Sequence, residues 1–278
     1  MSVSIDIEHL RQWVGREQVA GQTLEPFAAA AMSGLLDRAG VPPAAGDALP
    51  LPWHWLYFLE TPARASIGVD GHPQRGGFLP PVPLPRRMWA GGRLEFSAPI
   101  QAGIPAEKTS QVETVETKEG RTGTLAFVTL RHEITQDGAL RLTEWQDLVY
   151  REDPDPNAPK PTPPRAREDE QETREVGFDT TLLFRYSALT FNGHRIHYDL
   201  DYAREVEMYP GLVTHGPLIA QHLMLKAVRE LGSLVGFSFR AASPLAHYEA
   251  LTLCRSGQEL WARAPDGRVV MEAVADAG

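Results

Sequence analysis

The sequence contains very little cysteine, since Cys254 is the one thiol among 278 residues. A single cysteine excludes an internal disulfide and a zinc site made of several thiolates. Long apolar runs are missing as well, because no segment reaches the roughly 18 consecutive apolar residues of a membrane-spanning helix. The N-terminal stretch MSVSIDIEHLRQWVG has neither the basic nor the apolar region of a secretory signal. We therefore expect a cytoplasmic protein without a membrane partner.

Positive charge is in deficit. Lysine and arginine number 27 against 36 aspartates and glutamates, and the formal net charge is −9. This balance argues against nucleic acid as a partner, although a local basic patch can still bind an anionic ligand. Hydrophobic residues make up 42% of the chain and charged residues 23%, so the sequence predicts an ordinary globular protein with a sizeable core.

Proline is concentrated in the stretch EDPDPNAPKPTPPRAREDEQE, residues 152–172. Closely spaced prolines oppose regular helix and sheet, and the charges that follow favour solvent. We predict a Pro-rich, charged linker over residues 152–179. It divides the chain into an N-terminal half, residues 1–151, and a C-terminal half, residues 180–278.

The two halves share one order of elements. In the first, the helical segment EPFAAAAMSGLLDRAG ends at Gly40, and a loop rich in proline and glycine follows to about residue 92. In the second, an apolar helix runs from Gly216 to Gly232. Each is followed by segments typical of antiparallel strands. These are RLEFSAPI, KTSQVETVETKEG, TLAFVTLRHEITQDG and LRLTEWQDLVYRE in the first half, and GFSFRAASPL, YEALTLCRSG, QELWARAP and DGRVVMEAVADA in the second.

A similar first strand supports this repeat. LEFSAPI at 94–100 and FRAASPL at 239–245 both follow the helical region of their half. A helix as apolar as the second one needs an apolar wall, which a curved antiparallel sheet supplies. We therefore predict an α+β double hotdog, in which two antiparallel sheets each wrap around a central helix and join edge to edge. An unrelated pair of α+β domains is the alternative.

A loop rich in histidine precedes the second helix. The stretch RYSALTFNGHRIHYDLDYA, residues 185–203, holds Asn192, His194 and His197. Two histidines without an H-E-x-x-H helix or further acidic ligands do not make a metal site, so we expect no metal. The sequence also lacks the G-x-S-x-G elbow of serine hydrolases and a G-x-G-x-x-G dinucleotide fingerprint after a strand.

The segment YSALTFNGHRIHYDLDYA, followed by YPGLVTHGPL, resembles the MaoC-type hotdog hydratases and dehydratases, in which a D-x-N-P-x-H loop precedes an H-G turn. Asn192 lies five residues before His197, where the family has its catalytic Asp, and His194 stands where the family has Asn. The form N-x-H-R-x-H-Y-D, with LPRRMWAGGRLEF in the first half, is similar to the branch of type 2 hydroxyacyl-thioester dehydratases and mesaconyl-CoA and itaconyl-CoA hydratases. The resemblance implies an acyl-CoA substrate and no separate cofactor.

Hydration of an unsaturated thioester needs a base for water, a proton donor for the α carbon and stabilisation of the thioester oxygen. We predict His197 as the acid/base residue, because the pKa of histidine lies near neutrality. Asn192 cannot take up a proton and would only orient water. His194 either transfers a proton or fixes the tautomer of His197. The backbone amide of Gly216, at the first turn of the helix, would stabilise the developing enolate.

Substrate binding is predicted from residues near the loop. Arg195 and Arg185 could read a carboxylate of the substrate, although Arg195 could instead pair with Asp199 or Asp201 as a brace. Tyr198 and His215 are further candidates, with loop support and a turn as their alternative roles. Further basic candidates are Arg86, Arg87 and Arg93 for the carboxylate and Arg240 and Lys226 for the CoA phosphates. The segment LPLPWHWLYFLETP would either cover the first sheet or form a lid over the acyl pocket.

The predicted function is a hydro-lyase that interconverts mesaconyl-CoA or itaconyl-CoA with citramalyl-CoA. One alternative is a 3-hydroxyacyl-thioester dehydratase, acting on CoA or acyl-carrier-protein esters. A hotdog that binds acyl thioesters without catalysis is another. We expect one site per chain, built from the C-terminal loop and roofed by the N-terminal half. A homodimer is compatible with the fold.

Overall fold

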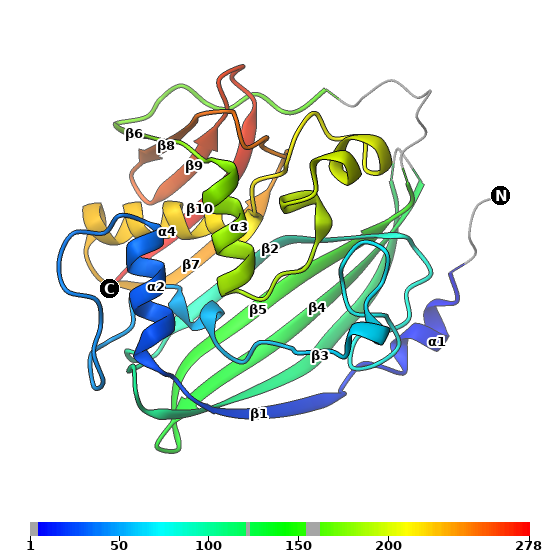
Figure 1. Ribbon diagram of the computed structural model, residues 1–278, viewed down its shortest axis with the longest axis horizontal. Coiled ribbons are helices and arrows are strands. Elements are labelled where there is room, and N and C mark those ends of the chain that lie inside the picture. Colours follow the sequence, from blue (N-terminus) through cyan, green and yellow to red (C-terminus); the bar gives the residue numbers. More distant parts are fainter. Residues whose placement is uncertain (1–4, 121–122, 154–161) are drawn as a thin grey trace.

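The computed structural model describes residues 5–120, 123–153 and 162–278. In these residues ten antiparallel strands form one curved sheet, and the longer helices lie on one side of it (Figure 1). The strand order is β1-β3-β4-β5-β2-β7-β10-β9-β8-β6.

The N-terminal half supplies five neighbouring strands. They are β1 (Glu17–Thr23), β2 (Arg86–Phe96), β3 (Pro105–Gly120), β4 (Gly123–Gln136) and β5 (Ala139–Arg151). Buried and partly exposed side chains alternate along most of β4, as expected for a strand with one face on a core. Asp137 and Gly138 both have positive φ, which a two-residue hairpin between β4 and β5 requires. The predicted strands of this half are therefore confirmed.

The C-terminal half supplies the other five strands around an apolar helix. They are β6 (Glu172–Val176), β7 (Leu234–Ala241), β8 (Leu251–Ser256), β9 (Glu259–Arg263) and β10 (Val269–Ala277). The helix α4 (Gly216–Leu231) packs on β7, β8, β9 and β10. Its Leu218, Leu223 and Met224 are fully buried, so the predicted central helix is confirmed.

The halves join through β2 and β7, which pair from Gly91 with Arg240 to Glu95 with Gly236. A Cβ atom added at Gly91 would lie 2.6 Å from the carbonyl oxygen of Phe239, so the close approach of the strands requires glycine there. This seam is the edge-to-edge junction predicted for the double hotdog.

The helix of the N-terminal half is shorter than predicted. α2 (Pro26–Leu35) ends before Asp37, which has a positive φ, and it packs against α3 (Thr180–Leu189) and the 3₁₀ turn η1 (Trp53–Leu56). α1 (Ile7–Arg11) contacts β3 instead. The middle of the inner face of β3, β4 and β5 is thus left to line a cavity.

Three short helical turns complete the fold. They are η2 (Arg64–Ser66), the 3₁₀ turn η3 (Arg195–His197) and the π-helical turn η4 (Tyr202–Val206).

Both edge strands, β1 and β6, escaped prediction. β6 lies inside the segment predicted as a linker and pairs with β8, whereas residues 154–161 of that segment lie outside the described residues. The boundaries of the two halves and the linker stay a prediction. Among the described helices, none has the length and apolar character needed to cross a membrane.

Candidate active site

A cavity of about 550 Å³ lies between the two halves. The histidine-rich loop lines it with Asn192, His194 and His197, and α4 contributes Gly216 from its first turn. The N-terminal half lines the cavity from the opposite side, and further residues of the C-terminal half, such as Pro244 and Met271, complete the lining. The contribution of the N-terminal half includes His72, Arg87, Trp89, Lys108, Ser110, His132 and Gln146. The structure thus brings together all four residues predicted to be catalytic.

His197 presents one ring nitrogen to the cavity. Its Nδ1 lies 2.7 Å from the carbonyl oxygen of Val213. A carbonyl can only accept, so Nδ1 carries the proton and Nε2 keeps a free lone pair. Burial, with a smaller contribution from His194, lowers the pKa of His197 to about 3, although the hydrogen bond to Val213 opposes this shift. At neutral pH His197 is therefore a neutral base.

This contact bears on one of the two roles left open for His194. The tautomer of His197 is fixed by a backbone carbonyl, so His194 is not needed for that task. The His194 ring lies edge-on to the His197 ring, with centroids 5.5 Å apart. Its Nε2 lies 3.8 Å from Glu207 Oε1, and Glu207 in turn pairs with Arg86 at 3.0 Å.

Asn192 and Gly216 contribute hydrogen-bond donors. Asn192 Oδ1 accepts the backbone N–H of His194 at 3.0 Å, which leaves the side-chain NH₂ as a donor. Gly216 is the first residue of α4, where backbone N–H groups lack acceptors inside the helix. Both residues line the cavity, so both donors belong to a site that can hold a water and a developing oxyanion.

The N-terminal half contributes an imidazole that sequence reasoning missed. His72 lines the cavity, and its ring centroid lies 4.2 Å from that of His194. Asp70 Oδ2 lies 2.9 Å from His72 Nδ1. Burial opposes ionisation of Asp70, but the hydrogen bonds and charge of His72 hold its pKa well below its usual value. Ligand atoms of Asp70, His72 and His194 lie within 4.8 Å of one another, which is close enough for one metal ion to reach all three.

The loops that carry these histidines dock backbone to backbone. Arg195 donates its N–H to the carbonyl of Asp70 at 2.9 Å. Gly71 has a φ of +90°, and a Cβ atom added there would collide with the carbonyl oxygen of Gly193 at 1.8 Å. Only glycine permits this approach, so the sequence Asp70-Gly71-His72 is shaped to meet the catalytic loop.

The predicted carboxylate reader Arg195 has other contacts. Its guanidinium pairs with Asp199 at 2.7 Å, donates to the carbonyl of Val69 at 3.1 Å and lies over the ring of Tyr202. It does not line the cavity. The prediction that Arg195 binds substrate is therefore not supported, and the brace is the better interpretation.

Three other predicted binding residues also lie off the cavity. Arg185 is exposed on α3. Tyr198 is 45% exposed and donates its hydroxyl to the carbonyl of Gly193 at 2.9 Å. His215 is fully buried, stacks on His197 at 3.7 Å and bonds Ser187 Oγ at 2.8 Å. Tyr198 and His215 support the loop from outside the cavity, because their side chains are already held by protein atoms.

The candidates for the CoA phosphates lie elsewhere. Lys226 is fully buried in α4 and pairs with Glu230 at 2.7 Å, and Arg240 pairs with Glu272 at 2.6 Å on the outer face of the sheet. The cavity instead contains Arg87, Lys108 and Arg151. Burial lowers the pKa of Lys108, against the opposing charges of Glu144 and Glu60.

The floor of the cavity on β3, β4 and β5 is mostly polar, with Leu130 and Leu148 as its apolar side chains. Ser110 Oγ lies 2.8 Å from His132 Nδ1, and Gln146 lies 3.3 Å from His132 Nε2. Behind them the buried Glu144 binds His54 at 3.0 Å and accepts from Trp55 at 2.8 Å. The segment proposed as a lid thus packs mainly into the core, with Trp53 1% exposed, and its end lines the cavity with Phe58 and Glu60.

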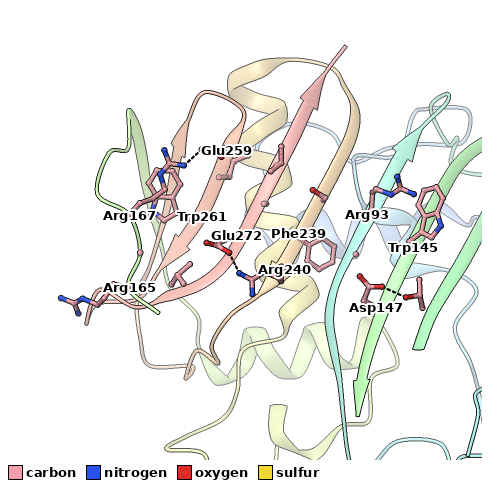
Figure 2. Close-up of a pocket in the computed structure, with 18 of the residues that line it drawn as sticks. Arg93, Trp145, Asp147, Arg165, Arg167, Phe239, Arg240, Glu259, Trp261 and Glu272 are labelled. Carbon is pink, nitrogen blue, oxygen red and sulfur yellow. Dashed lines mark hydrogen bonds and ion pairs between the residues drawn. The ribbon is translucent and has the colours of Figure 1, made fainter. Parts of the chain in front are cut away.

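A wider groove of about 960 Å³ lies on the other face of the sheet. Figure 2 shows it across β2 and β7, with α4 behind the strands. Its cations are engaged: Arg93 stacks on Trp145, Arg240 pairs with Glu272, and Arg167 pairs with Glu259. None of the predicted catalytic residues lines this groove.

The family model of the type 2 hydroxyacyl-thioester dehydratases matches residues 52–247, more than half of the chain. The chain belongs to this family. One relative, the mesaconyl-C(4)-CoA hydratase of Chloroflexus aurantiacus, is 45% identical over 275 residues, which cover 96% of this chain and 97% of the relative. The chain is therefore a hydro-lyase, as the sequence predicts.

Solved structures of low sequence identity confirm the double hotdog fold of the chain. A MaoC-like dehydratase from Phytophthora capsici superposes with a TM-score of 0.69 at 11% identity, covering 99% of this chain and 100% of that one. A Mycobacterium tuberculosis protein described as a double hotdog gives a TM-score of 0.56 at 12% identity, covering 94% of this chain and 95% of that one.

Proposed function

We propose that this enzyme adds water to a short unsaturated dicarboxylic acyl-CoA, with mesaconyl-C4-CoA as substrate and citramalyl-CoA as product. The observation that carries the proposal is Arg87, which lines the histidine cavity close enough to His72 to lower the pKa of that imidazole by its charge. Among the described residues no carboxylate forms an ion pair with Arg87. A guanidinium so placed suits a substrate carboxylate.

The chemistry of the substrate explains this location. In mesaconyl-C4-CoA the free carboxylate is attached to the β carbon, which is the carbon that water attacks. The group that binds the carboxylate must therefore lie beside the acid/base residues rather than at the end of a long tunnel. Arg87 meets that requirement through its proximity to His72. The 45% identity to a mesaconyl-C(4)-CoA hydratase supports the same substrate.

The proposed mechanism uses the contacts of the loop and of α4. His197 Nε2, free of a proton, removes one from the water while the water oxygen bonds to the β carbon. The electron pair of the double bond moves to the thioester oxygen, where the Gly216 N–H and the positive end of α4 stabilise the enolate. The Asn192 amide orients the water. A proton delivered to the α carbon then completes the addition.

The polar floor weighs against the first alternative, a dehydratase of straight-chain fatty acyl groups. An alkyl chain laid against Ser110, His132 and Lys108 would take these groups from water without replacing their hydrogen bonds. The second alternative, binding without catalysis, would leave the free lone pair of His197 without a task. Itaconyl-CoA carries the same carboxylate, but its double bond lies between the β and γ carbons. It is a second substrate of the same proposal by way of a proton shift that gives mesaconyl-C4-CoA, to which water then adds.

The test is to assay the enzyme with crotonyl-CoA, mesaconyl-C4-CoA and an acyl-carrier-protein ester by the loss of enoyl-thioester absorbance, and with itaconyl-CoA by the formation of citramalyl-CoA. We expect the highest kcat/KM with mesaconyl-C4-CoA. Arg87→Lys should lower that value by about 100-fold, because lysine cannot make the two-point contact, and should spare crotonyl-CoA. Arg93→Lys, on the same strand but the opposite face, is the matched control. Equal losses on both substrates would overturn the assignment of Arg87.

The remaining expectations belong to the same proposal. CoA is part of the substrate, so the reaction needs no separate cofactor or metal. We propose a cytoplasmic location, where acyl-CoA esters are available, and a homodimer as the compatible assembly.

A further inference from the structure

Asp70 and His72 face the catalytic loop from the opposite half of the molecule. A carboxylate only accepts hydrogen bonds, so the 2.9 Å contact from Asp70 Oδ2 places a proton on His72 Nδ1 and leaves Nε2 free. His72 lines the cavity, and its ring lies against that of His194. An imidazole oriented by a carboxylate is the arrangement that stabilises an imidazolium formed during a reaction.

The position of this pair is built into the backbone. The carbonyl of Asp70 accepts the N–H of Arg195, the carbonyl of Val69 accepts from the Arg195 guanidinium, and Gly71 touches Gly193. Four consecutive residues, 69 to 72, therefore contact the catalytic loop. A surface loop without a role in the site would not need a glycine with positive φ pressed onto that loop.

The reaction also needs a group that carries a proton to the α carbon. Asn192 cannot carry a proton, and His197 has only the neutral carbonyl of Val213 behind its ring, so a positive charge on His197 lacks a counter-charge. His72 has such a counter-charge in Asp70. The N-terminal half thus offers what the catalytic loop lacks.

We propose that Asp70 and His72 form the second proton-transfer couple of the site, and that His72 is the catalytic residue that delivers the proton to the α carbon. The proposal rests on the proposed function and completes it. The proton that His197 removes from water passes to His72 Nε2 within the cavity, and Asp70 stabilises the imidazolium. His72 then gives this proton to the α carbon as the enolate electron pair forms the C–H bond. Water is consumed as OH on the β carbon and H on the α carbon, and both imidazoles return to neutral.

The resting state of His72 agrees with this role. Burial lowers the pKa of His72 to about 4, against the hydrogen bond that His72 donates to Asp70, and the charges of Arg87 and His194 lower it further. Asp70, Arg87 and His194 have the largest effects on the His72 ring, and His197 also interacts with it through charge. At neutral pH Nε2 is therefore free to receive a proton.

The reverse of this step can be observed alone. A saturated thioester such as butanoyl-CoA has no hydroxyl to lose, so removal of its α hydrogen needs His72 and the Gly216 amide but not His197. We would incubate the enzyme with butanoyl-CoA in D₂O and follow deuterium entering the α position by mass spectrometry. The wild type should catalyse this exchange.

Four variants separate the roles. His72→Gln and Asp70→Asn should each lower the exchange rate and the hydration rate by about 100-fold, the scale for loss of a positioned proton-transfer group. His197→Gln should lose hydration of crotonyl-CoA but retain exchange. His9→Gln, an exposed histidine in α1, is the matched control and should change neither rate.

Each other outcome overturns the inference. Exchange that survives in His72→Gln, exchange lost in His197→Gln, or no exchange by the wild type would each remove His72 from the step at the α carbon. Activity that a chelator abolishes and zinc restores would make Asp70, His72 and His194 metal ligands instead. Failure of the proposed substrate is a separate result, because it appears as preference for crotonyl-CoA while exchange into butanoyl-CoA still reports on His72.

Discussion

The His197 ring is buried and stacks on His215, so a test variant must keep its volume. Glutamine does so but cannot accept a proton. We expect His197→Gln to lower kcat for hydration by about 100-fold or more while the melting temperature stays near that of the wild type. Steady-state kinetics and a thermal melt measure the two effects. A folded variant with near-normal kcat would exclude His197 as the base.

At the residue scale, part of the site could be predicted because spacing along the chain fixes it. Asn192, His194, His197 and Gly216 lie on one loop and the helix that follows, so their proximity does not depend on distant packing. Asp70 and His72 lie in a glycine-rich loop without periodicity, and the docking of Gly71 onto Gly193 brings them in. The prediction that Arg195 binds substrate is not supported because proximity along the chain does not fix direction. Neighbouring residues of a 3₁₀ turn project to different sides.

At the scale of elements, the contact between the loops of His72 and of His194 depends on Gly71. Gly71→Ala introduces a methyl group at 1.8 Å from the carbonyl of Gly193, so the loops must separate. We expect kcat to fall at least about tenfold without loss of the fold, since misplacement near 1 Å is that costly. Gly76→Ala is the control, because Gly76 also has positive φ but its added methyl would meet nothing closer than Pro81 at 3.8 Å.

Arg195 ties the same two loops together through Asp199 and the carbonyl of Val69. Arg195→Lys keeps the charge but loses the planar group that makes both contacts. We expect kcat/KM to fall by a similar factor, about threefold to tenfold, for mesaconyl-C4-CoA and crotonyl-CoA alike. Parallel assays on the two thioesters give the ratio. A loss confined to mesaconyl-C4-CoA would restore the carboxylate role of Arg195.

Helices and strands could be predicted from the sequence where burial of one face makes their apolar residues recur at a regular spacing. α4 and the inner strands have one face on the core, and their apolar residues recur accordingly. β1 has only exposed side chains, and β6 only exposed or partly exposed ones, so neither shows a pattern, and their backbone pairing with β3 and β8 is what makes them strands. α2 ends early, before Asp37, whose positive φ is incompatible with a continuing helix and is not evident from the residue type alone.

For the whole molecule, buried neutral histidines set the response to acid. Burial lowers the pKa of His72, His132 and His222 to about 4 and of His197 to about 3, and that of His215 also falls well below 6.5. Below about pH 6.5 these histidines bind protons in the unfolded chain but not in the folded chain. The free energy of unfolding therefore falls as pH falls from 6.5 toward 4. Each histidine contributes up to about 1.4 kcal/mol per pH unit to this slope.

Urea unfolding at a series of pH values measures the slope. His222 lies outside the cavity. His222→Gln should lower the number of protons taken up on unfolding by about one, because the variant has no imidazole there that must stay neutral in the folded chain. His9→Gln should leave it unchanged, since His9 is exposed. A free energy of unfolding that is flat between pH 6.5 and 4 would contradict the neutral state of these buried rings.

The seam between β2 and β7 also determines the order in which the molecule assembles. Gly92 pairs with Phe239, whereas β4 meets β5 across a turn of two residues. Closing a long loop costs entropy before any contact repays it, so the hairpins form first and the seam last. Until it closes, β2 and β7 are two complementary open edges on a half-assembled chain. In a crowded refolding mixture each edge can pair with that of another chain, and the seam is where exchanged dimers begin.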